Sequence, residues 1–72
     1  MLNKVTLLEK SYKYGEFNRS FNADFRSTPP PLKDEDILWV FNSDILALAE
    51  SDAEIAELEE AVLDSWKAGY SA

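Results

Sequence analysis

Histidine and cysteine are both absent from the 72 residues of this chain. Their absence removes the usual general base, the nucleophilic thiol and the best ligands for transition metals. Enzyme chemistry would then depend on carboxylates, and acid pairs such as Glu57 and Glu60 fall on a helix face that we expect to be exposed, which is a poor setting for general acid–base work. We therefore expect no enzyme activity, no cofactor and no metal site.

Without cysteine, no disulfide can stabilise a core this small, so the usual solution of small secreted proteins is excluded. Long apolar runs are also missing, since the longest, Ile37 to Phe41 and Ile45 to Ala49, have five residues each. Neither run is long enough for a signal peptide or a membrane span. We expect one cytoplasmic domain over residues 1–72 that does not span a membrane. Its small core should be stabilised by a partner or by homodimerisation.

Basic residues are scarce in the second half of the chain. Residues 34–72 contain eleven acidic side chains and only Lys67 as a basic one, whereas residues 1–33 have a net charge of +3. The net charge of −7 is thus the sum of a mildly basic half and a strongly acidic half. Two interpretations stay open: the halves attract each other, or the acidic half presents a negative surface to a basic partner.

Glycine is limited to Gly15 and Gly69, so a glycine-rich phosphate loop is excluded. Residues 17–25 alternate apolar and polar side chains, with phenylalanine at Phe17, Phe21 and Phe25, and this period of two predicts a strand. Residues 5–12 are rich enough in β-branched and aromatic residues to pair with it, with Gly15 in the turn. We predict an antiparallel β-hairpin over residues 1–26.

The three prolines stand together at 29–31, where they cannot continue a strand or enter a helix interior. We interpret residues 27–33 as an extended, proline-rich linker. The acidic residues 34–36 then favour a helix start, and apolar residues at helical spacing predict a helix over 34–50, either continuous, which we prefer, or bent near Ser43.

Ser51 and Glu54 form a capping box that starts a second helix, which should end near Lys67 with Gly69 as its left-handed C-cap. The fold class that follows is α+β: an N-terminal antiparallel β-hairpin, a proline-rich linker and an acidic pair of antiparallel α-helices over 34–72, packed on the phenylalanine face.

For function, we expect a small acidic protein that binds and inhibits or modulates a protein partner with a basic surface, such as one that normally holds nucleic acid. Direct nucleic-acid binding is not expected, because the acid excess repels phosphates. Small acidic proteins of phages and mobile elements, including anti-defence inhibitors and DNA mimics, offer an analogy of size and charge only. The expected partner-binding residues are Glu50, Glu54, Glu57, Glu60, Asp64 and Trp39.

Two alternatives remain open at this point. The chain could be a structural or assembly subunit that binds through an apolar patch around Trp39 and Trp66, with its charge serving only solubility. It could also be a neutralising antitoxin, which differs from an inhibitor only in the identity of its partner.

Overall fold

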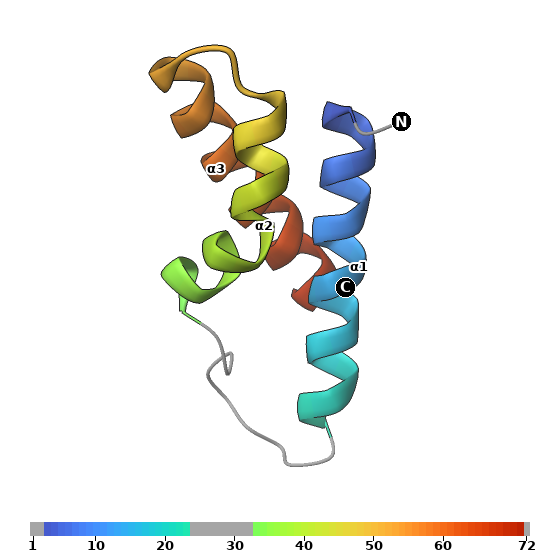
Figure 1. Cartoon of the computed structure of the whole chain (residues 1–72). Helices are drawn as coiled ribbons and strands as arrows, with labels where there is room; N and C mark the ends of the chain where they lie inside the picture. The colour runs from blue at the N-terminus through green and yellow to red at the C-terminus, as the bar shows by residue number, and fades with distance from the viewer. Residues whose placement is uncertain (1–2, 24–32, 72) are drawn as a thin grey trace.

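Three helices make up the described part of the chain in a computed structural model, which describes residues 3–23 and 33–71 (Figure 1). They are α1 (Lys4–Ala23), α2 (Asp34–Leu48) and α3 (Asp52–Ser71). Helix α2 runs opposite to α1, and α3 passes behind both, so that its C-terminal end lies beside the middle of α1 (Figure 1). Within the described residues the fold is entirely helical.

The predicted β-hairpin over residues 1–26 is therefore wrong, and with it the α+β fold class. The misleading pattern was the recurrence of phenylalanine every four residues, because this spacing fits a strand of period two and a helix equally well. The real start signal is Asn3, whose side-chain oxygen accepts a hydrogen bond from the amide of Thr6 at 2.9 Å. Asparagine is a preferred N-cap, so α1 begins where its first free amides find an acceptor.

Gly15 is not in a turn but in the interior of α1, at its closest approach to α3. A β-carbon added there would overlap the carbonyl oxygen of Trp66 and lie 2.9 Å from the amide nitrogen of Tyr70. Gly69 is likewise inside α3 rather than capping it, and a β-carbon added there would overlap the carbonyl oxygen of Tyr12. The two glycines of the chain thus let the backbones of α1 and α3 touch.

Small and polar side chains complete this contact between α1 and α3. Ser11 is fully buried on α1, and its hydroxyl donates to the carbonyl of Leu7 at 2.9 Å. The Ser65 hydroxyl of α3 donates across the interface to the carbonyl of Leu8 at 2.6 Å. Both hydroxyls are satisfied, so the close contact leaves no buried side-chain donor without an acceptor among the described residues.

The two helices predicted after the proline segment are present. Helix α2 is continuous, with Asp34, Glu35 and Asp36 in its first turn, and the amide of Glu54 donates to the Ser51 hydroxyl at 3.2 Å at the start of α3. The predicted end of α3 is wrong, because the helix continues through Gly69 to Ser71. The linker interpretation of residues 27–33 lies outside the described residues, except at Lys33.

The apolar core contains one buried residue of α1 and a row of buried residues at helical spacing on each of α2 and α3. Phe17 does not belong to it, since 60% of Phe17 is exposed, and the predicted packing of two helices on a phenylalanine face is wrong at this position. Tyr14 instead meets Phe41 edge to face, with ring centroids 5.7 Å apart. The buried apolar residues are Leu7, Ile37, Phe41, Ile45, Leu58, Val62 and Trp66.

Candidate functional site

The outward side of α3 carries a line of carboxylates, Glu57, Glu60 and Asp64, which we call the acidic face of α3. Spacings of three and four residues place the three side chains on one side of a helix. The buried residues Leu58 and Val62 face the other way, into the core, and all three carboxylates are exposed. The fold therefore orients α3 so that its acidic side meets solvent.

No ion pair among residues 3–23 and 33–71 includes these three charges. The ion pairs among the described residues join Lys10 to Asp44 at 3.4 Å and Lys67 to Asp34 at 3.8 Å, and neither includes the acidic face of α3. The contact between α1 and α3 instead depends on the two glycines and on neutral hydrogen bonds such as Trp66 Nε1 to Asn18 Oδ1, at 2.9 Å. The acidic face keeps its charge available to another molecule.

The other acidic residues expected in the binding site lie apart from this face. Glu50 is exposed in the connection between α2 and α3, and Glu54 is half-buried beside the N-cap of α3, with its amide bonded to Ser51. The predicted acidic site thus divides into a face of three residues and two flanking positions.

Trp39 lies on a different helix, and it is the most exposed large apolar residue described, at 80% exposure. Val40 and Leu46, which sequence reasoning did not assign to a site, are 45% and 53% exposed on the same helix. We call these three residues the outer surface of α2. The sequence signal was available, because Trp39 and Leu46 are seven residues apart and therefore fall on one side, away from the buried stripe of Ile37, Phe41 and Ile45.

The alternative prediction of an apolar patch around Trp39 and Trp66 is wrong for Trp66. Only 1% of Trp66 is exposed, and its indole stacks on Tyr70 with ring centroids 4.9 Å apart. An apolar contact made by this chain can therefore include Trp39 but not Trp66.

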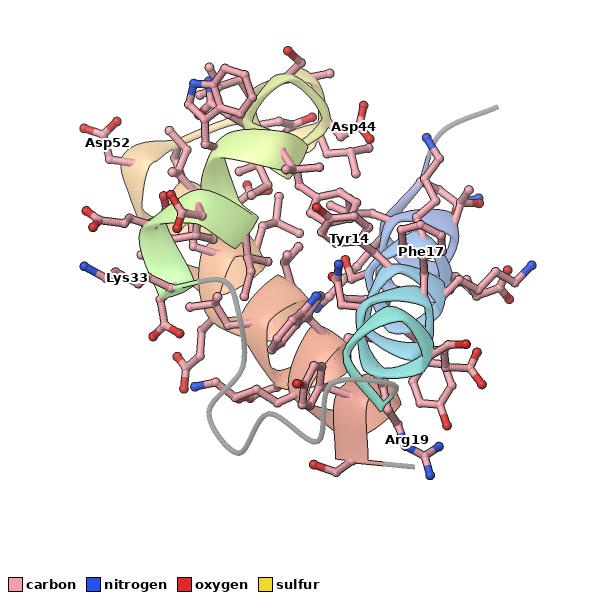
Figure 2. The ribbon with its side chains drawn as sticks, turned by 90° about the horizontal axis from the view of Figure 1, so that it is seen from below. Tyr14, Phe17, Arg19, Lys33, Asp44 and Asp52 are labelled. Atoms are coloured by element: carbon pink, nitrogen blue, oxygen red, sulfur yellow. The ribbon has the colours of Figure 1, made fainter. Side chains whose placement is uncertain are left out.

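Opposite charges are unevenly distributed over the fold, although two ion pairs, Lys10 to Asp44 and Lys67 to Asp34, join them across helices. Figure 2 places Arg19 beside α1 and Asp52 on the far side of α2, at opposite edges of the molecule. Helix α1 supplies Lys4, Lys10, Lys13 and Arg19, all exposed, whereas α2 contains no basic residue. The exposed charged side chains of α2 and α3 are therefore mostly acidic, with Lys67 of α3 as the basic exception.

Among residues 3–23 and 33–71, no group of acidic side chains is gathered closely enough to hold a metal ion. No helix in the same residues has the length and apolar character needed to cross a membrane. Comparison with protein families, curated proteins and solved structures finds no match for this chain.

Proposed function

We propose that this chain is a small, non-catalytic acidic protein that binds a macromolecule with a basic surface and thereby inhibits or modulates it. The observation that supports this function is the acidic face of α3, where Glu57, Glu60 and Asp64 are exposed in one line without an ion-pair partner in the described part of the chain. Negative surfaces of this kind steer basic partners and set the register of docking.

The arrangement carries a cost for folding. Glu60 lies three residues from Glu57 and four from Asp64, and like charges at these spacings destabilise a helix by about 0.2–0.5 kcal/mol per pair. Lysine at one of these positions would remove the cost, and the chain does contain lysines elsewhere, on α1. A face that is unfavourable for the helix, and that has no ion-pair partner where the chain is described, supports a role in binding.

Reversing two charges of this face is expected to weaken partner binding without harming the fold. In the Glu57→Lys/Glu60→Lys variant, repulsion between residues 54 and 57 and between 60 and 64 becomes attraction, so the free energy of unfolding should stay level or rise slightly. The affinity for a basic partner recovered from native lysate by the tagged chain should fall about tenfold or more, because the contact loses complementary charge. Affinity is measured by titration of the purified partner.

The matched control is Glu9→Lys/Glu16→Lys, which makes the same two reversals at exposed glutamates of α1. This control loses attraction to Lys13, so it should be slightly less stable than the unmodified chain while keeping its affinity. Equal loss of affinity in both variants would show that net charge matters and not the acidic face of α3. Unchanged affinity in the Glu57→Lys/Glu60→Lys variant would contradict the proposed function.

Within this function, we propose that the basic surface of the partner is one that normally holds nucleic acid, as in the acidic inhibitors that mimic DNA. The support is chemical: a row of exposed carboxylates offers the same charge as a row of phosphates. Addition of the chain should then displace DNA or RNA from the recovered partner, and simultaneous binding of both would argue against this choice of partner.

A second candidate function is that of an assembly subunit that binds through apolar surface, and the exposure of Trp39 favours it. Exposed aromatic residues are common anchors in protein interfaces. Salt dependence separates this candidate from the first, since screening weakens charged contacts far more than apolar ones.

A further inference from the structure

The outer surface of α2 combines three apolar side chains that the core does not need. Trp39, Val40 and Leu46 are exposed by 80%, 45% and 53%, while Ile37, Phe41 and Ile45 bury the other side of the same helix almost completely. Helix α2 is therefore apolar on two sides, of which one is covered in the part of the chain that the structure describes. Anchors at positions i and i+7 of a helix are the pattern with which amphipathic helices enter apolar grooves.

The charged residues of α2 itself are all acidic. Asp36 lies one turn before Trp39, and Glu50 follows the end of α2; both are exposed. The chain contains no lysine or arginine between Lys33 and Lys67, so α2 and its connection to α3 contribute only acidic charges to the rim, and the basic groups that reach α2 pair with Asp44 and Asp34. A complementary partner must supply an apolar centre and basic edges.

We propose that the outer surface of α2 docks into an apolar groove edged by lysine and arginine on the partner, with Trp39 as the anchor. This inference rests on the proposed function, since it takes the partner to be basic. It adds an apolar contact that supplies much of the binding affinity. Trp39 and Leu46 fill the groove, while Asp36 and Glu50 meet the basic edges. Aromatic anchors surrounded by polar contacts are the usual source of affinity in such interfaces.

A second copy of this chain fits the surface poorly. Two α2 helices brought face to face would place the acidic residues of one against those of the other, and such like-charge contacts are unfavourable. Charge complementarity therefore points to a different, basic protein.

Two synthetic peptides test the chemistry of the partner directly. One is an amphipathic Leu/Lys peptide, which carries an apolar strip edged by ammonium groups, and the other is a Ser/Lys peptide of equal length and equal charge. We expect the full chain to bind the Leu/Lys peptide about tenfold more tightly or better, as measured by the fluorescence anisotropy of labelled peptide. Both peptides should bind more weakly in high salt.

The chain offers a closely matched pair of variants for locating the contact. Trp39→Ser/Leu46→Ser removes an aromatic and an aliphatic residue seven positions apart on α2, and Val5→Ser/Tyr12→Ser removes the same kind of pair, at the same spacing, from α1. All four side chains are exposed, so both variants should fold, which circular dichroism checks. We expect the first variant to bind the two peptides equally, and the second to keep the preference for Leu/Lys.

The possible failures are distinguishable. Equal binding of the two peptides by the unmodified chain, or a preference that survives in Trp39→Ser/Leu46→Ser, would overturn this inference and leave the acidic binding function standing. Loss of the preference in Val5→Ser/Tyr12→Ser would also overturn it, since the apolar contact would then not be on α2. Self-association in sedimentation that Trp39→Ser/Leu46→Ser abolishes would make a second copy the occupant. Binding of neither peptide would count against the proposed function itself.

Discussion

Replacing Gly15 by alanine is expected to unfold the chain or to lower its free energy of unfolding by about 3 kcal/mol or more. The added methyl group would overlap the carbonyl oxygen of Trp66, and backbone atoms, unlike side chains, cannot rotate away. Helices α1 and α3 would have to separate, which would expose the core between them. Thermal and urea unfolding, followed by the helical circular dichroism signal at about 222 nm, measure the loss in the free energy of unfolding.

The sign of this effect is what makes it informative. In an exposed helix interior, alanine is more favourable than glycine by about 1 kcal/mol, so the same substitution would ordinarily stabilise. Gly69→Ala should be as damaging as Gly15→Ala, because its β-carbon would overlap the carbonyl oxygen of Tyr12. Ser20→Ala, at an exposed position of α1, is the control and should be neutral or slightly stabilising. A Gly15→Ala variant more stable than the unmodified chain would contradict the contact between α1 and α3.

Replacing Trp66 by alanine should cost about 3–5 kcal/mol, the usual range for a buried aromatic residue. Trp66 is 1% exposed, it stacks on Tyr70, and its indole nitrogen donates to Asn18, so the substitution removes packing and also leaves Asn18 without this donor. A chain of this size has roughly 4–11 kcal/mol of stability in total, which makes the loss a large share of it. Chemical denaturation monitored by circular dichroism gives the value.

The control for this prediction is the same substitution at the other tryptophan. Trp39 is 80% exposed and contributes nothing to the core, so Trp39→Ala should change stability by less than about 0.5 kcal/mol. Comparable losses for the two tryptophans would show that the packing described for α2 and α3 is incorrect.

The sequence predicted the second half of this fold and missed the first for a specific physical reason. In α2 and α3 the apolar residues recur at three and four, and the acidic first turns suit the helix dipole, so these local signals agree. In α1 the buried stripe consists of Leu7, Ser11 and Gly15, and its two small residues give no apolar periodicity. The small residues that let the two helix backbones approach closely were therefore interpreted as turn residues.

The candidate site was predictable to a similar, partial degree. Exposure of Glu57, Glu60 and Asp64 follows from the periodicity of α3 alone, and the isolation of Trp39 from the apolar stripe of α2 was foreseeable on the same ground. Burial of Trp66 against Tyr70 and Asn18 was not, because that contact depends on the position of α1, which the hairpin interpretation misplaced. Tertiary packing decides which of two tryptophans can meet a partner.

The most direct test of the proposed function is the salt dependence of the affinity between the unmodified chain and the partner that it retains from native lysate. If the acidic face of α3 makes the contact, affinity should fall steeply, by about tenfold or more, between physiological ionic strength and about 0.5 M salt, and the Glu57→Lys/Glu60→Lys variant should show a shallower fall. An affinity that stays constant through this range, with the variant equal to the unmodified chain, would contradict the account.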